Sequence, residues 1–328
     1  MGTQKDFNAI LLNAQKLLRE NKWVEQYKTY AEVMTENLKF ISDKKSNFNE
    51  WAPLYFYITT TKAKESKTKL TLDVRYKGQN VAILKCDDND RVTLSTKGFD
   101  NKNLRHFKCD IQLDNEEWTK ATAFRKFFRD IEFKKTHKKE SSIESLLLTE
   151  FSKTGGSKLI RGIQPVKFGG KIRFAMPTPL SASDYDNLTF APNALGGGID
   201  ILTRVGKSGS DVRLCIIEVK DTNETKEPPI AALQQAVEYT IFIRELLRSD
   251  AGPLWWKLFG FSGKIPAPGK LTLYSACAMP TLDPKPDDES FKEMHLDIDG
   301  DMIECHYIYF SLSDDENSFE SIKTSLPG

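Results

Sequence analysis

Two acidic residues and a lysine follow a spacing that predicts a shared reactive site. Asp200 comes after a glycine triplet and one isoleucine, and Glu218-Val219-Lys220 ends an apolar run that follows a polar turn. Because alternate side chains of a strand point to the same face, Glu218 and Lys220 are predicted to lie together while Val219 packs in the opposite layer. Two carboxylates with one lysine can bind a cation and stabilise charge on a substrate.

The segments on either side of the polar turn 207–211 predict an antiparallel hairpin. Both are rich in β-branched residues, and the turn has the composition of a hairpin loop. Pairing Gly206 with Val212 across a loop of about five residues also places Asp200 opposite Glu218. Cross-strand neighbours lie about 5 Å apart at Cβ, so the two carboxylates are expected to be close.

Carboxylates this close repel each other, and Lys220 offsets only part of the repulsion, so a bound cation is expected. Mg²⁺ fits best, because it is a hard ion that usually takes one or two carboxylates and leaves its other positions to water and substrate phosphate. Lys220, as a point charge, can hold an attacking water or stabilise charge that develops on a phosphate.

This pattern resembles the PD-(D/E)XK, or restriction-endonuclease-like, nuclease superfamily, in which an acid at a strand end is followed by an acid-x-lysine strand. Asp200 matches the first acid and Glu218-Val219-Lys220 the triplet, whereas Ile199 stands where the family pattern has proline. The resemblance implies that Asp200, Glu218 and the Val219 carbonyl hold Mg²⁺ or Mn²⁺. The metal and Lys220 would then activate water for in-line attack on a phosphodiester.

Two predicted helices are expected to add residues to this catalytic set. Gln235 and Tyr239 lie one turn apart on a helix predicted at 230–248, and this Gln-x-x-x-Tyr pattern resembles recombination-type nucleases of the superfamily, whose glutamine lies near the metal. The family also often supplies a helical glutamate from upstream. Glu144 is the first candidate and Glu150 the second, and a capping-box role is an equally weighted interpretation of Glu144.

The elements around these residues predict an α/β protein with an αβββαβ restriction-endonuclease-like core, preceded by a separate α+β domain. The predicted domains are residues 1–136, without an assigned role, and 137–328. The expected core contains, in order, a helix from an N-cap at Ser141 to about residue 153, one hairpin element formed by 159–166 and 171–176, the two strands around turn 207–211, the helix 230–248 and a strand at 270–278.

The N-terminal residues predict helices first and strands second. Hydrophobic spacing and turn residues indicate two helices within 7–40, a strand at 55–58, a hairpin of 70–76 with 81–84, a strand at 92–95 and an amphipathic helix from 118 to about 133. The apolar block 255–259 is interpreted as core in preference to a lid or a partner surface.

The densest basic run of the chain lies on and after this amphipathic helix, near a domain boundary predicted at His137. Clustered Lys and Arg residues can contact a nucleic-acid backbone, and a solvated linker is the equally weighted alternative. The run consists of Arg125, Lys126, Arg129, Lys134, Lys135, Lys138 and Lys139.

Composition and motifs restrict the other function classes. The formal net charge is +1, so attraction to nucleic acid must come from a local patch. Five scattered cysteines without a CxxC pair argue against disulfides or zinc and favour the cytoplasm. No segment predicts a signal peptide or a membrane span. Gly206-Lys207-Ser208 is not a P-loop, because Ile201 stands where the first glycine belongs.

The resemblance therefore implies an Mg-dependent phosphodiesterase, with an endonuclease favoured and DNA favoured over RNA, and the lack of signal-peptide and membrane-span patterns predicts that it is soluble. Restriction, anti-phage defence and repair suit it equally, no membrane partner is expected, and a homodimer is left open. The alternative is a catalytically inactive module on the same fold that binds nucleic acid or protein. The intact set of Asp200, Glu218 and Lys220 argues against that alternative.

Overall fold

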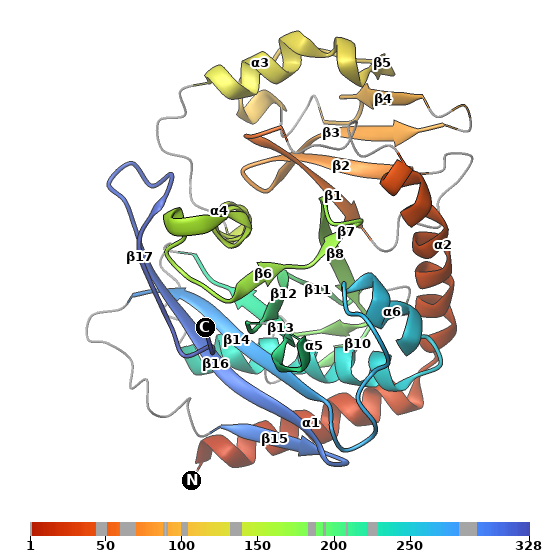
Figure 1. Cartoon of the computed structure of the whole chain (residues 1–328), viewed down its shortest axis with the longest axis vertical. Coiled ribbons are helices and arrows are strands. Elements are labelled where there is room, and N and C mark those ends of the chain that lie inside the picture. Colours follow the sequence, from red (N-terminus) through yellow and green to blue (C-terminus); the bar gives the residue numbers. More distant parts are fainter. Residues whose placement is uncertain are drawn as a thin grey trace.

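The helices of this protein cover two large sheets that share one interior (Figure 1). The computed structural model describes residues 2–43, 51–59, 70–87, 89, 91–99, 104–131, 140–182, 188–192, 195–207, 209–221, 229–281 and 294–328. Within this part the fold is mixed α/β. Its α-helices are α1 (Gly2–Glu20), α2 (Val24–Asp43), α3 (Thr122–Asp130), α4 (Glu140–Ser152), α5 (Pro229–Arg248) and α6 (Gly252–Leu258).

The first sheet has eight strands and combines segments from both sides of the predicted boundary at residues 136 and 137. Its order is β11-β8-β1-β2-β3-β4-β5, with β7 paired to β8. Tyr57 of β1 lies opposite Arg173 of β8 in a parallel pair, while residues 132–139 lie outside the described part. The strands are β1 (Leu54–Thr59), β2 (Leu70–Tyr76), β3 (Gln79–Cys86), β4 (Val92–Ser95), β5 (Glu116–Glu117), β7 (Lys167–Phe168), β8 (Ile172–Thr178) and β11 (Gly197–Ile199).

The predicted β2–β3 hairpin is confirmed, and its turn contacts α4. Lys77 and Gly78 both have positive φ, at 46° and 78°, as the tight turn of a two-residue hairpin requires. A side chain at Gly78 would overlap the backbone of Ser141. Ser142 Oγ donates a hydrogen bond to the Lys77 carbonyl at 3.3 Å. The turn therefore fixes the first sheet against the start of α4.

The second sheet has seven strands in the order β15-β16-β14-β13-β12-β6, with β17 paired to β16. Strand β12 runs antiparallel to both β6 and β13, whereas β13, β14 and β16 are parallel. The strands are β6 (Ile163–Pro165), β12 (Ile201–Val205), β13 (Arg213–Val219), β14 (Thr272–Pro280), β15 (His295–Ile298), β16 (Asp301–Leu312) and β17 (Phe319–Thr324). A short pair, β9 (Leu180–Ser181) and β10 (Thr189–Phe190), lies apart from it.

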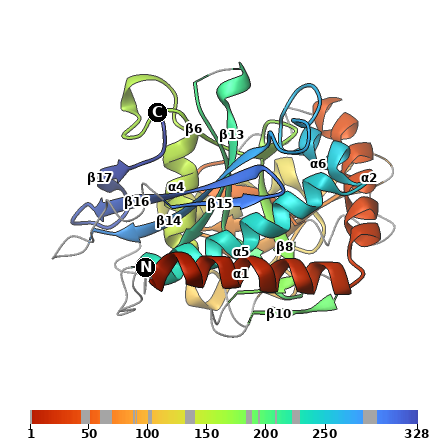
Figure 2. The same cartoon turned by 90° about the horizontal axis from the view of Figure 1, so that it is seen from below.

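The two faces of the second sheet bury different helices. Ile217 and Val219 of β13 share a buried cluster with Leu147 of α4. Ile216, which precedes Ile217 and lies on the same strand face as Glu218, belongs to the cluster that contains Val237 of α5. The packing role predicted for Val219 is thus confirmed, and Glu218 is directed toward α5. Figure 2 shows α1 lying along the outer side of α5.

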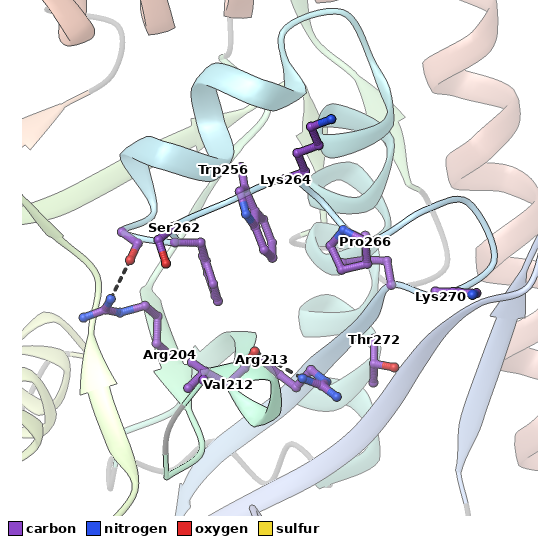
Figure 3. Close-up of a pocket in the computed structure, with 13 residues that line it drawn as sticks. Arg204, Val212, Arg213, Trp256, Ser262, Lys264, Pro266, Lys270 and Thr272 are labelled. Carbon is purple, nitrogen blue, oxygen red and sulfur yellow. Dashed lines mark hydrogen bonds between the residues drawn. The ribbon is translucent and has the colours of Figure 1, made fainter.

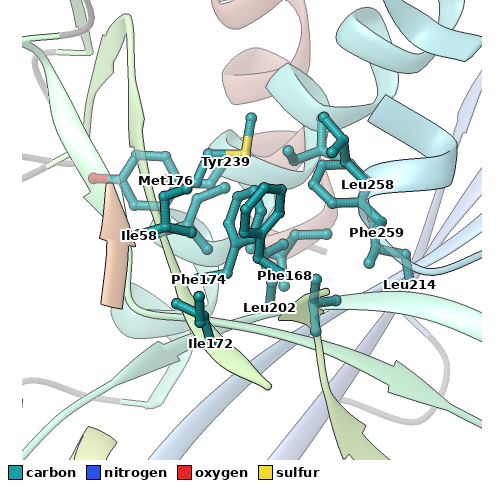
Figure 4. Close-up of a cluster of buried hydrophobic side chains, with 14 of the residues drawn as sticks. Ile58, Phe168, Ile172, Phe174, Met176, Leu202, Leu214, Tyr239, Leu258 and Phe259 are labelled. Atoms are coloured by element: carbon teal, nitrogen blue, oxygen red, sulfur yellow. The ribbon is translucent and has the colours of Figure 1, made fainter. Parts of the chain in front are cut away.

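A single buried cluster continues from the second sheet into the first. It includes Ile58 of β1, Met176 of β8, Leu202 of β12 and Tyr239 of α5 (Figure 4). Trp255 of α6 is fully buried, and its Nε1 donates to the Tyr27 carbonyl of α2 at 3.1 Å. The core interpretation of the apolar block 255–259 is confirmed.

Three local predictions need correction. The stretches 159–166 and 171–176 do not form one hairpin, because β6 pairs with β12 while β7 and β8 form a hairpin in the other sheet. Ser141 lies inside the first turn of α4 and is not its N-cap. The helix expected from residue 118 is divided into a 3₁₀ turn, Trp118–Lys120, and α3. Among the described residues, no helix is long and apolar enough to cross a bilayer.

Candidate active site

Asp200 lies at a bend where the chain passes from one sheet to the other. The preceding strand β11 pairs with β8 in the first sheet, and the following strand β12 pairs with β13 in the second. Asp200 Oδ2 accepts a hydrogen bond of 2.8 Å from the Val219 N–H. This bond holds the carboxylate beside the end of β13, next to Glu218.

The register predicted for the hairpin is confirmed. Ile201 lies opposite Ile217, and the pairing continues without a shift to the turn. Extended by one residue, the same ladder sets Asp200 across from Glu218.

Lys220 connects Glu218 with Gln235 of α5. Its Nζ donates to Glu218 Oε1 at 3.0 Å and to Gln235 Oε1 at 2.8 Å. The Lys220 side chain is only 8% exposed. Gln235, predicted near the metal, therefore contacts the lysine and positions its charge. Glu140 Oε1 of α4 lies 3.7 Å from the same ammonium.

Helix α4 contributes Glu144 to the acidic cluster. The pKa of Glu144 is raised to about 7, mainly by burial; the charge of Arg75 lowers it, and the charges of Glu218 and Glu140 raise it. Glu150, the second candidate, lies elsewhere, since its Oε1 accepts a hydrogen bond from the Leu159 N–H at 2.6 Å. Of the two glutamates, the structure brings Glu144 to the site.

The carboxylate of Asp200 lies in a region of uncompensated negative charge. Burial raises its pKa well above the usual value, and Glu218 and Glu144 raise it further, against a smaller lowering by the Val219 N–H. Like charges in a buried space disfavour ionisation. A cation beside these carboxylates would remove that penalty.

Tyr239 and the glycine triplet meet at the same place. A side chain at Gly197 would overlap the Tyr239 hydroxyl, so glycine is needed for the close approach of β11 to α5. Burial, followed by the charges of Glu218 and Asp200, raises the pKa of the Tyr239 phenol. Gln235 and Tyr239 thus both face the acidic cluster, as the Gln-x-x-x-Tyr pattern predicted.

Sequence reasoning missed two glutamates at the site. Glu238 is fully buried, and in the described part of the chain neither of its carboxylate oxygens has a hydrogen-bond partner. Its pKa is raised to about 8, first by burial and second by the charge of Glu218. Glu238 follows Gln235 by three residues and Glu140 precedes Glu144 by four, so helical spacing could have identified both.

Arg75 of the first sheet is a cation beside this cluster that the sequence analysis did not predict. It lies over the ring of Tyr57 at 4.3 Å and donates through Nε to Asn80 at 2.8 Å. Its charge lowers the pKa of Glu144, against the dominant effect of burial. The N-terminal strands therefore supply part of the electrostatic environment of the site.

The donor chemistry fits a hard divalent cation with few protein ligands. Within the residues that the structure describes, no group of three or more His, Cys, Asp or Glu side chains is arranged to hold a metal. Asp200 and Glu218 offer two carboxylates, and Mg²⁺ commonly takes one or two and completes its shell with water and phosphate. The Val219 carbonyl remains a predicted ligand.

The described part of the basic run lines a separate pocket of about 370 Å³ with Trp51. Arg125 stacks over the Trp51 ring, and Arg129 Nε donates to Asp130 Oδ1 at 2.8 Å. Lys126 also lines this pocket. The remaining members of the run, Lys134, Lys135, Lys138 and Lys139, lie outside the described residues.

Comparisons of this chain with models of protein families, with curated proteins and with solved structures found no match. Its function is therefore inferred from the chemistry of the site.

Proposed function

We propose that this protein is a metal-dependent nuclease of the PD-(D/E)XK type that hydrolyses phosphodiester bonds. One observation carries the proposal. The buried Lys220 donates hydrogen bonds to Glu218 and Gln235, and Asp200 accepts one from the backbone N–H of Val219, the residue between Glu218 and Lys220. An acid pair can hold the metal, and an adjacent oriented ammonium can stabilise charge on the phosphate, so this set suits metal-assisted phosphoryl chemistry.

The order of elements around the site supports the same fold type. Within the second sheet, α4 is followed by β6, β12 and β13, which are antiparallel neighbours, and then by α5 and by β14, which is parallel to β13. Strands β7 to β11 come between β6 and β12 in the chain but lie outside this sheet. Helices α4 and α5 bury opposite faces of these strands. Apart from β7 to β11, this order is consistent with the helix, three strands, helix, strand order expected of a restriction-endonuclease-like core, and it supports the proposal to that extent.

Asp200, Glu218 and the Val219 carbonyl would hold Mg²⁺ or Mn²⁺. When bound, the ion supplies Lewis acidity and lowers the pKa of its water. The raised pKa of Asp200 supports this assignment, because a buried acid pair with excess negative charge favours a cation.

Lys220 would act on the water or on the phosphate. Its ammonium keeps a fixed position because it donates hydrogen bonds to Glu218 and to the neutral Gln235, which lie on two different elements. A preorganised donor of this kind stabilises charge that develops during in-line attack. Arg75 offers a second positive charge on the side of the first sheet.

DNA is the proposed substrate and endonucleolytic cleavage the proposed action, in restriction, anti-phage defence or repair. The pocket of Trp51, Arg125, Lys126 and Arg129 supports a backbone contact away from the acidic cluster, because arginine and lysine neutralise phosphates. The non-catalytic alternative gives no reason to bury Lys220 and Glu218, whose desolvation is costly.

The direct test incubates purified protein with supercoiled plasmid, linear duplex DNA, single-stranded DNA and RNA, each with Mg²⁺, Mn²⁺ or EDTA. We expect cleavage with either metal and none with EDTA. Lys220→Ala should lower the rate by about 10²-fold or more while metal binding, followed by calorimetry, persists. Asp250→Asn, at an exposed position between α5 and α6, is the matched control. A folded protein that cleaves none of these substrates would overturn the proposal.

A further inference from the structure

A second pocket lies at the turn end of the β12–β13 hairpin, away from the acidic cluster (Figure 3). Its volume is about 590 Å³, within the range of small-ligand sites. Arg204, which lines it, is separated from Asp200 by four residues of strand, or roughly 13 Å. The pocket and the acidic cluster are thus distinct sites.

Two aromatic rings form one wall of this pocket. Trp256 and Phe261 are stacked with ring centroids 4.0 Å apart and an interplanar angle of 16°. Figure 3 shows the Trp256 indole projecting into the space above Val212 and Arg213. A planar ring can add to such a stack, since aromatic faces bind nucleic-acid bases without regard to sequence.

The Trp256 indole also carries an unused donor. The residue is 7% exposed, and its Nε1 has no hydrogen-bond partner among the described residues. A buried N–H without an acceptor is costly. This N–H is itself enclosed by protein, so the pocket offers a ligand the aromatic rings of this wall and not this donor.

The charge of the lining favours an anion. Among the described residues that line the pocket, four are basic and none is acidic: Arg204, Arg213, Lys264 and Lys270. Arg204 donates to the Gly260 carbonyl at 2.7 Å, and Arg213 neighbours Glu304 of β16. The exposed Lys264 and Lys270 are therefore the cations most available to a phosphate at the rim.

We infer that this pocket binds a nucleotide, with its base against the Trp256–Phe261 stack and its phosphate toward Lys264 and Lys270. The ligand is either a free nucleotide or one unit of a single strand, since both present the same base and phosphate. Binding here requires neither a metal nor the acidic cluster, so it stands apart from the proposed nuclease activity.

Calorimetry tests the inference by measuring the affinity of the protein for four ligands in EDTA, which removes any metal. The ligands are deoxyadenosine monophosphate, deoxyadenosine, inorganic phosphate and a short oligodeoxythymidine. We expect the monophosphate or the oligonucleotide to bind more tightly than deoxyadenosine or phosphate alone. Binding of the monophosphate would identify a free nucleotide, and binding of the oligonucleotide alone a strand. Asp200→Asn should bind as the wild type does, which separates this result from any failure of the nuclease proposal.

The variants are chosen to keep the fold. Phe261→Leu keeps an apolar side chain at a partly exposed position but removes one planar ring of the stack, and should weaken binding about tenfold. Lys264→Ala with Lys270→Ala should weaken it and reduce its salt dependence, whereas Lys257→Ala, exposed on the same helix as Trp256, should not. Thermal melting verifies that each variant is folded. The inference would be overturned if the protein bound none of these ligands, or if it bound inorganic phosphate as tightly as the nucleotide. It would also be overturned if neither the aromatic variant nor the double lysine variant changed the affinity.

Discussion

Lys220 at the end of β13 and Gln235 of α5 are joined by a hydrogen bond of 2.8 Å from Lys220 Nζ to the glutamine Oε1. Glu218 accepts from the same ammonium at 3.0 Å. The amide is neutral, so it fixes the direction of the lysine without cancelling its charge. Strand and helix together hold this donor in place before a substrate arrives.

Removing the amide should therefore impair turnover more than metal binding. Gln235→Ala leaves Lys220 with one acceptor fewer and lets it relax toward Glu218, and we expect the cleavage rate to fall about tenfold or more. Rate measurements over a metal titration separate the two effects. Gln234→Ala, one position earlier on the same helix, is the control, and equal rates in the two variants would contradict a positioning role for Gln235.

Neutralising one acid should stabilise the metal-free protein while abolishing its activity. Asp200→Asn keeps an oxygen that can accept the Val219 N–H but removes a charge beside Glu218 and Glu144, whose repulsion raises the pKa of Asp200. We expect the melting temperature in EDTA to rise by a few degrees, equivalent to about 1 kcal/mol. Glu218→Gln should not raise it, because this change also removes the charge that pairs with the buried Lys220 ammonium at 3.0 Å. A lower melting temperature in Asp200→Asn would show that repulsion is not the dominant effect.

Glu238 should make the metal-free protein less stable as pH rises. Its pKa is raised from 4.5 to about 8 in the folded state, so folding favours the protonated form. The stabilisation is fully present below about pH 4.5 and is lost as pH rises through about 8, with a total of roughly 3–5 kcal/mol.

Glu238→Gln keeps the shape and removes this titration. Melting temperatures in EDTA between pH 5.5 and 8.5 should therefore fall less steeply in Glu238→Gln than in the wild type. Parallel pH profiles would mean that Glu238 is not buried as a protonated acid.

The basic pocket should contribute salt-dependent affinity for nucleic acid. Lys126→Ala with Arg129→Ala removes two of its charges but leaves the Arg125–Trp51 stack. We expect weaker DNA binding and a slope of log affinity against log salt that is smaller by about two. Lys16→Ala with Arg19→Ala, two exposed residues of α1, is the matched control. An unchanged slope would identify the run as a solvated linker.

The acid pair at the centre of this site is encoded locally. Asp200 and Glu218 lie on the two sides of one turn, so β-alternation and loop length suffice to set their register, and the observed pairing of Ile201 with Ile217 agrees. The spacing of Gln235 and Tyr239 is likewise a property of one helix. Such relationships depend on backbone geometry over short distances, which the sequence specifies directly.

The environment of that pair was decided by tertiary packing. The charge of Arg75 acts on Glu144 because the first sheet contacts α4 through the Gly78 turn. Strand β6 likewise pairs with β12 and not with β8. Alternation tells which face of a strand is apolar but not which distant strand will pair with it. That choice depends on how side chains far apart in sequence fill one shared interior, and only the folded chain resolves it.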